Sequence, residues 1–171
     1  MGLAFLAARR GVKVIGLTSP ANLTKLRGFG LYDEVVAYDA IGGLKADGAV
    51  DYVDFAGRSA VTQVVHETFG DQLQQSIGVG ITHWDAMGGP RPTTGPKSVM
   101  FFAPDRIRKR MKDWGPEEMG ARFTAVLEGF IAANPWMKLK HHDGPDALQA
   151  LYADVVAGRM QPDEGHIVRP G

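Results

Sequence analysis

The chain has 171 residues, of which 44% are hydrophobic and 22% charged, a composition typical of one globular domain with a sizeable core. Its 19 basic and 19 acidic side chains give a formal net charge of zero, which disfavours nucleic acid and acidic lipid as partners. The absence of cysteine excludes a disulfide, a thiolate nucleophile and a cysteine-ligated zinc. No apolar run reaches the ~20 residues of a membrane span, and the first arginines follow an apolar run instead of preceding it as in a secretory signal. We therefore expect a cytoplasmic protein.

The first half of the chain alternates between helical and strand-like patterns. Residues 59–69 are typical of a helix, because Val61, Val65 and Phe69 repeat at helical spacing after Ser59, a residue that favours a helix cap. Short apolar runs bounded by turn residues are typical of strands. In chain order, we predict a helix over 2–10, a strand over 12–17, a short helix over 21–27, strands over 34–38 and 50–55, the helix over 59–69 and a strand over 76–81.

The second half opens with a loop rich in glycine and proline, from about residue 85 to 97. After it we predict a strand over 98–102, helices over 105–114 and 116–133, a strand over 137–141, a helix over 145–157 and a strand over 165–168. The helix over 116–133 opens with proline and two acids and carries Met119, Phe123 and Leu127 on one face. Strands that alternate with helices predict an α/β fold with a mostly parallel sheet.

The order of these elements, together with four short motifs, resembles a known architecture. The motifs are Val14–Asn22 (VIGLTSPAN), Gly30–Val35 (GLYDEV), Val50–Gly57 (VDYVDFAG) and Lys112–Pro116 (KDWGP). The chain is similar to the cofactor domain of the medium-chain dehydrogenase/reductase superfamily, nearest the zinc-independent quinone oxidoreductases. All the motifs except Val50–Gly57 resemble, more narrowly, a quinone-oxidoreductase-like family catalogued as a domain of unknown function. The resemblance covers nearly the whole chain and implies a Rossmann-like parallel sheet with flanking helices.

One departure from the superfamily pattern affects the whole domain. In that pattern a catalytic domain comes first, followed by a strand and a Gly-rich turn that cradles the cofactor pyrophosphate. By the resemblance, residues 2–10 correspond to the helix after the turn, so we expect the first strand and the turn to be lacking. In the strand order 3-2-1-4-5-6 this strand is central, and its neighbours at 12–17 and 50–55 have unpaired edges unless they pair with each other. We therefore expect residues 1–171 to be a single truncated Rossmann-like cofactor domain, with about 134–171 a C-terminal extension returning toward a missing catalytic domain.

The residues after the strand at 12–17 bear on which dinucleotide the chain would bind. An acid there would bind a ribose 2′-hydroxyl, whereas small polar residues with a nearby cation suit a 2′-phosphate. The chain has Thr18, Ser19 and Asn22, with Lys25 further along and no acid. This pattern favours NADP(H) as the cofactor, for a chain that has its pyrophosphate turn. The alternative is that Ser19 caps a helix and Lys25 is a solvated charge.

Three further residues are candidates for cofactor contacts. By the resemblance, Tyr38 packs beside the adenine end of the dinucleotide. Gly57 and Gly80 follow strands at the carboxyl edge of the sheet, where ligands of open α/β sheets bind, and glycine there lets the backbone approach a ribose or nicotinamide. The alternatives are a half-buried tyrosine at a strand end and ordinary glycine turns.

The candidates for a substrate pocket are Thr82, His83 and Trp84, which leave the same edge of the sheet. His83 is the candidate proton donor to a reduced quinone or enone, because histidine titrates near neutrality. A solvated loop histidine is the alternative, and no catalytic residue is assigned.

For a cluster of cations, a pair of histidines and a single histidine, we favour a structural role over a functional one. Five cations lie within residues 106–112, and helical spacing spreads them away from the apolar stripe, as on a solvated helix face. The adjacent His141 and His142 point to opposite faces of a strand, so we expect no metal there. His66 lies off the apolar face of its helix, and we expect it to be exposed to solvent.

The leading functional hypothesis is an NADPH-dependent quinone or enone oxidoreductase-like protein with a small carbonyl or quinone substrate. Inactivity of this chain alone stays open, because the pyrophosphate turn is lacking. The main alternative is a non-catalytic binding or assembly module of the same fold. A methyltransferase-like domain is disfavoured by the Thr18–Ser19 pair, and an RNA-binding module by the zero net charge. We expect no membrane partner, and the sequence leaves a homodimer open.

Overall fold

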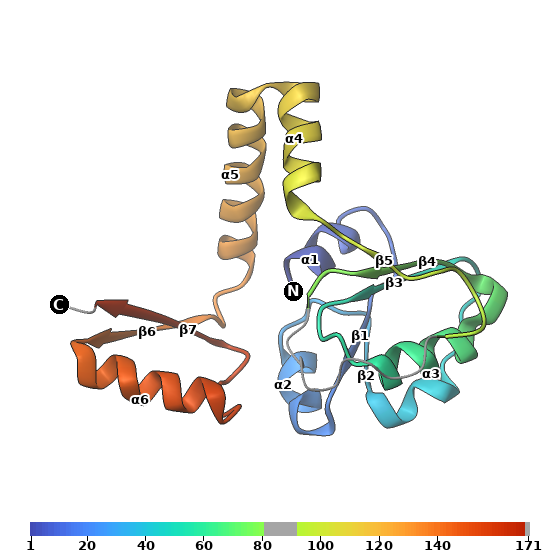
Figure 1. The fold of residues 1–171 in the computed structure, drawn as a ribbon, viewed down its shortest axis with the longest axis horizontal. Helices are drawn as coiled ribbons and strands as arrows, with labels where there is room; N and C mark the ends of the chain where they lie inside the picture. Colours follow the sequence, from blue (N-terminus) through green and yellow to red (C-terminus); the bar gives the residue numbers. More distant parts are fainter. Residues whose placement is uncertain (81–91, 170–171) are drawn as a thin grey trace.

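The computed structural model of the protein describes residues 1–80 and 92–169 (Figure 1). Its helices are α1 (Gly2–Ala8), α2 (Leu23–Gly28), α3 (Ser59–Phe69), α4 (Ala103–Trp114), α5 (Pro116–Ala133) and α6 (Pro145–Val156), with 3₁₀ turns η1 (Pro20–Asn22), η2 (Tyr38–Gly43) and η3 (Gly70–Gln72). Its strands are β1 (Ile15–Thr18), β2 (Glu34–Ala37), β3 (Val50–Asp54), β4 (Leu73–Gly78), β5 (Val99–Met100), β6 (Lys138–Asp143) and β7 (Glu164–Arg169). The bounds of α3 and α5 coincide with the predicted helices. None of the helices in this described part has the length and apolar character needed to cross a lipid bilayer.

Every strand pairing between these elements is parallel. β1 pairs with β2, β4 lies between β3 and β5, and β6 pairs with β7. Helices flank the strands, so the predicted α/β class with parallel strands is confirmed. The strands are divided among separate short sheets, however, where the sequence predicts one mostly parallel sheet.

A slot separates the two sheets of the N-terminal half. Across the described residues β1 pairs only with β2 and β3 only with β4, so β1 and β3 do not close on each other. Both strands line a cavity of about 420 Å³. Its lining includes Lys13, Ile15 and Leu17 on the β1 side and Val50, Asp51 and Tyr52 on the β3 side. The unpaired strand edges expected from the sequence are therefore present, and they face this slot.

One hydrophobic core nevertheless joins the two sheets. Ile41 of η2 is fully buried, and it packs in one cluster with Val65 and Phe69 of α3 and Tyr52 of β3. Leu17 of β1 packs against the same cluster. Because burial of a side chain of this size contributes about 1.5–3 kcal/mol, η2 and α3 hold the sheets together without a backbone ladder between them.

The C-terminal segment forms a β–α–β unit of its own. β6 and β7 are connected by α6, and Figure 1 shows this unit beside the N-terminal sheets. The rings of Phe29 and Trp136 stack with their centroids 3.9 Å apart, and the Lys25 ammonium lies 2.7 Å from the Asp163 carboxylate. The unit therefore contacts the region around α2. Its return toward a catalytic domain stays a prediction.

Helices α4 and α5 form an antiparallel hairpin that projects from the rest of the fold (Figure 1). Gly115 separates them with a φ of +78°, a backbone conformation that favours glycine. At the other end of α5, the rings of Phe5 and Phe130 meet edge to face with centroids 5.6 Å apart. The hairpin is thus attached to α1 at its base and extends outward from there.

Candidate functional site

The carboxyl ends of β1, β2 and β3 come together at one edge of the molecule. Thr18 lies opposite Ala37 in the parallel β1–β2 ladder, so Ser19 and Tyr38 leave the sheet at the same level. Arg58, in the turn after β3, holds its guanidinium carbon 5.3 Å from the centre of the Tyr38 ring. This contact joins the end of β3 to the end of β2 across the slot. Ligands of open α/β sheets bind at such an edge.

The Tyr38–Arg58 pair places a positive charge on an aromatic surface. A tyrosine ring attracts a guanidinium to its face, and the planar guanidinium still offers N–H donors that match a phosphate or carboxylate. Burial raises the pKa of Tyr38 above its ordinary value, while the charge of Arg58 lowers this pKa and the Asp54 carboxylate raises it. The phenol therefore stays neutral at physiological pH, and the pair carries the charge of Arg58.

Asp54, the last residue of β3, shapes the turn that carries Arg58. Its Oδ1 accepts hydrogen bonds from the backbone amides of Ala56 (2.8 Å) and Gly57 (2.9 Å), and its Oδ2 accepts one from the Thr62 hydroxyl (3.2 Å). Gly57 has a φ of +73°, so the turn itself requires glycine there. Because one carboxylate oxygen binds the turn and the other binds Thr62 of α3, Asp54 acts on the site by positioning Arg58.

Asp54 and Arg58 are absent from the candidates that the sequence indicates. The signal that identifies them is an aspartate at a strand end followed three residues later by glycine, which is the pattern of a turn capped by an aspartate side chain. Reading that pattern requires knowing that the strand ends at Asp54, and the sequence predicts a strand over 50–55.

The three polar candidates after β1 lie at this edge with different exposures. Thr18 ends β1 and is buried, with 6% of its surface exposed. Ser19 and Asn22 are half-buried at the cap positions of η1 and α2, and neither side chain makes a capping hydrogen bond. Ser19 therefore does not cap the helix through its hydroxyl, which was the alternative to a cofactor contact.

Lys25 is held in an ion pair with the C-terminal unit. Its ammonium donates to Asp163 (2.7 Å) and to the Gln161 side chain (2.9 Å), and Lys138 contacts the same carboxylate at 3.2 Å. The hydrogen bond from Lys25 is the main cause that lowers the pKa of Asp163 to about 2. The cation that the structure places against Tyr38 is Arg58, and Lys25 joins α2 to the segment before β7.

Gly80 allows two backbone segments to approach closely. A Cβ atom built at Gly80 would lie 2.8 Å from the carbonyl oxygen of Phe55. The amides of Val79 and Gly80 both approach the carbonyl oxygen of Asp54, at 2.7 and 3.4 Å. The structure thus gives Gly80 a packing role at the candidate edge, and its predicted contact with a ribose or nicotinamide stays a prediction.

A family model described as "Protein of unknown function (DUF2855)" matches residues 1–161. The chain belongs to this family. The match includes the candidate edge, the α4–α5 hairpin and most of the C-terminal unit. It agrees with the resemblance to a family catalogued as a domain of unknown function, while the wider relation to medium-chain dehydrogenases and reductases stays a prediction. No curated protein matches the chain.

The predicted substrate-pocket residues of this DUF2855 chain cannot be placed against the edge. Thr82, His83 and Trp84 lie in residues 81–91, outside the described residues. Within the described residues, the candidate site consists of the strand ends around Arg58 and Tyr38.

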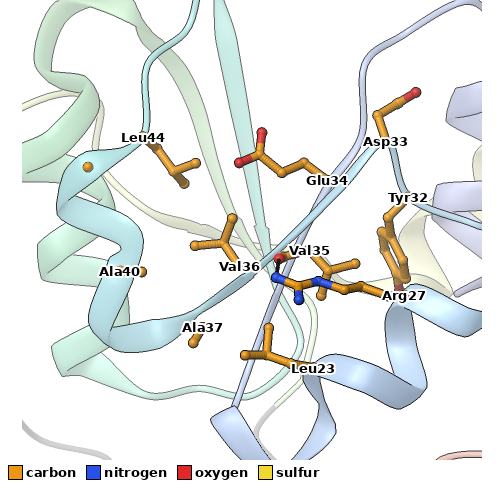
Figure 2. A pocket seen from close by; sticks show the side chains of 11 residues that line it. Leu23, Arg27, Tyr32, Asp33, Glu34, Val35, Val36, Ala37, Ala40 and Leu44 are labelled. Atoms are coloured by element: carbon orange, nitrogen blue, oxygen red, sulfur yellow. Dashed lines mark hydrogen bonds between the residues drawn. The ribbon is translucent and has the colours of Figure 1, made fainter.

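A second cavity, of about 630 Å³, lies along the outer edge of β2. Figure 2 shows the side chains that line it. Arg27 reaches over β2 and donates to the carbonyl oxygen of Val35 at 3.2 Å. Asp33 also lines this cavity, and its carboxylate accepts a hydrogen bond from the amide of Val14 at 2.7 Å. Because Arg27 and Asp33 already bind backbone groups, we interpret this cavity as the open edge of strand β2.

Two sets of contacts that involve histidine side chains were not indicated by the sequence. His66 is 1% exposed and bonded at both ring nitrogens, so the prediction that it is solvent-exposed is wrong. His142 lies within hydrogen-bond distance of His166 (2.8 Å) across the β6–β7 ladder. Among the residues that the structure describes, no three side chains of metal-binding type converge.

Proposed function

We propose that this DUF2855 chain belongs to an NADPH-dependent quinone or enone oxidoreductase-like protein and contributes the site for the 2′-phosphoadenosine end of NADPH. The observation that carries the proposal is the Arg58 guanidinium on the Tyr38 ring, at the edge where β1, β2 and β3 end. When bound, NADPH supplies a hydride to a quinone or enone. The cytoplasmic location is part of the same proposal.

The charges at this edge suit a 2′-phosphate better than a 2′-hydroxyl. A carboxylate at the end of β1 would bind a ribose 2′-hydroxyl and repel a phosphate, and β1 ends in Thr18 followed by Ser19. Arg58 can donate two parallel hydrogen bonds to a phosphate. Asp54 does not compete for the phosphate site, because its oxygens accept from the turn amides and Thr62.

The test uses a ligand that carries only this end of the cofactor. We expect adenosine 2′,5′-bisphosphate to bind at least about tenfold more tightly than adenosine 5′-monophosphate in calorimetric titrations, because a hydrogen bond to a charged group contributes about 1.5–3 kcal/mol. Arg58→Ala should abolish this preference, whereas Tyr38→Phe, which keeps the ring, should retain it. Arg159→Ala, which removes an exposed cation bound to Asp154, is the matched control. Equal affinity for the two ligands would contradict the proposal.

A non-catalytic binding or assembly module is the second candidate. The projecting α4–α5 hairpin favours it, because several large apolar side chains of these helices are exposed. The two candidates differ in turnover: an oxidoreductase oxidises NADPH when a simple benzoquinone is added, whereas a binding module leaves NADPH unchanged.

A further inference from the structure

Both helices of the α4–α5 hairpin carry exposed apolar residues, which form a stripe on α5. Phe123 is 67% exposed, Leu127 44% and Ile131 58%, and these residues follow one another every four positions on α5. Residues four positions apart lie on the same face of an α-helix. On α4, the half-exposed residues Ile107 and Met111 are spaced in the same way. A stripe of this size on a projecting hairpin is typical of an interaction surface.

Internal contacts fix the shape of the hairpin before any partner binds. The Trp114 ring lies between two guanidiniums, with Arg110 of α4 at 4.7 Å and Arg122 of α5 at 4.5 Å from its centroid. Arg122 also donates to Glu118 at 2.6 Å. These contacts hold the tips of α4 and α5 together, so the exposed stripe belongs to a preformed surface.

The two helices of the hairpin carry opposite charge. The segment Ala103–Trp114 (APDRIRKRMKDW) has five cations and two carboxylates, and Pro116–Ala133 (PEEMGARFTAVLEGFIAA) has three carboxylates and one cation. Arg108 and Lys112 are one turn apart on α4, so they lie on one side of that helix beside Met111. Glu117 and Glu128 are three turns apart on α5 and lie on one side of it, the side next to Ile131.

This arrangement of charges fits a second copy of the same hairpin. We propose that two copies of this chain pair through their α4–α5 hairpins into a four-helix bundle, with α4 of each copy lying along α5 of the other. A two-fold axis makes each copy supply both surfaces, so every basic α4 meets an acidic α5 and the apolar stripes pack between them. Pairing of α4 with α4 would instead oppose cation with cation. The proposal is independent of the cofactor proposed above.

The test combines mass measurement with reversal of charge. We expect sedimentation equilibrium to show a dimer of the wild-type chain at tens of micromolar. Arg108→Glu with Lys112→Glu should raise the dissociation constant at least tenfold, and so should Glu117→Lys with Glu128→Lys. The chain with all four changes should regain the dimer, because the opposite charges again face each other. Lys97→Glu with Arg159→Glu is the control, since both residues are exposed and lie outside the hairpin.

A second variant tests the apolar stripe. Phe123→Gln with Leu127→Gln should give a monomer whose circular dichroism and thermal unfolding match those of the wild type, because both side chains are exposed in a single copy. A wild-type chain that is monomeric at these concentrations would overturn the proposal and assign the stripe to another protein or segment. A dimer that survives the glutamine substitutions, or a four-residue reversal that stays monomeric, would overturn it equally.

Discussion

His66 is buried, and both of its ring nitrogens lie within hydrogen-bond distance of a partner. Its Nδ1 lies 2.8 Å from the carbonyl oxygen of Thr94, which can only accept, so Nδ1 carries the proton and donates it. Nε2 lies within hydrogen-bond distance of the Ser76 hydroxyl, at 2.9 Å, and Ser76 contacts Ser98 at 2.7 Å. This chain of hydrogen bonds joins α3 to β4 and to the segment before β5.

Replacing His66 should therefore weaken the fold. His66→Phe fills the same space but removes both ring-nitrogen hydrogen bonds: the Thr94 carbonyl loses this donor, and the buried Ser76 hydroxyl keeps only its contact with Ser98. Each such hydrogen bond contributes about 0.5–1.5 kcal/mol, so together they contribute about 1–3 kcal/mol. We expect the free energy of unfolding, measured in urea, to fall by this amount. His141→Phe is the control, because His141 is exposed, and it should change this free energy by less than about 0.5 kcal/mol. Equal effects of the two substitutions would contradict the buried network.

Replacing Gly80, another single residue, should also weaken the fold. Gly80→Ala puts a methyl group 2.8 Å from the Phe55 carbonyl oxygen, so one of the two backbone segments must move. We expect a loss of about 1–3 kcal/mol in the free energy of unfolding. Gly120→Ala, on α5 with no atom within 4 Å of the new methyl group, should instead raise this free energy by about 0.5–1 kcal/mol, because alanine favours a helix.

At the scale of elements, the β6–α6–β7 unit is held to α2 by charge and by stacked rings. The Asp163 carboxylate forms ion pairs with the ammonium groups of Lys25 and Lys138. The Phe29 ring stacks on the Trp136 ring, with an angle of 14° between the ring planes. Asp163 is 7% exposed, so its carboxylate depends on these two ammonium groups for its partners. The ion pair at Asp163 therefore makes the attachment of the unit dependent on pH.

The pKa of Asp163 gives the direction of this dependence. It lies at about 2 in the folded chain, below the ordinary value of 3.8, mainly because of the hydrogen bond from Lys25. A lowered pKa in the folded state contributes stability above the unfolded pKa, and this contribution disappears as the pH falls through the folded pKa. The wild type should thus be more stable than Asp163→Asn at pH 6, and the difference should shrink between pH 4 and 2. A pH-independent difference in thermal unfolding would contradict this assignment.

Much of the architecture at this scale follows from the sequence, and the exceptions have physical reasons. Apolar spacing is enough to place the helices over 59–69 and 116–133, and Pro116 with two acids marks the start of the second. The predicted cap at Ser59 is wrong: the backbone is still extended at Arg58, which is the N-cap, and Ser59 is the first helical residue. The burial of His66 depends on a carbonyl group 28 residues away, which no local pattern reveals. The Tyr38–Arg58 contact likewise joins two separate sheets, and only the tertiary structure brings these residues together.

At the scale of the whole molecule, the slot between β1 and β3 divides the N-terminal sheet. The carbonyl oxygen of Val14 accepts from the amide of Glu34, so Gly16 and Thr18, which follow in alternation, direct their backbone groups to β2. The amides of Ile15 and Leu17 consequently face the slot, whereas β4 has a strand on each side. The core around Ile41 holds the sheets together while leaving these edge amides unpaired within the described residues.

Hydrogen exchange should detect the slot directly. We expect the amides of Ile15 and Leu17 to exchange at least about 100-fold faster than those of Ile77 and Gly78, which are paired with β3 and β5, because the local opening that exposes an edge amide costs little free energy. The amide of Gly16, paired with β2, is the control within the same strand. Slow exchange at Ile15 and Leu17 would mean that the slot is closed in solution.

Cofactor binding by this chain can be measured in a single series of titrations. We would measure the binding of NADPH, NADH and S-adenosylmethionine to the wild-type chain by calorimetry under identical conditions. We expect NADPH to bind at least about tenfold more tightly than NADH, because of the proposed phosphate contact to Arg58, and S-adenosylmethionine not to bind. Equal binding of NADPH and NADH, or binding of neither, would contradict this expectation.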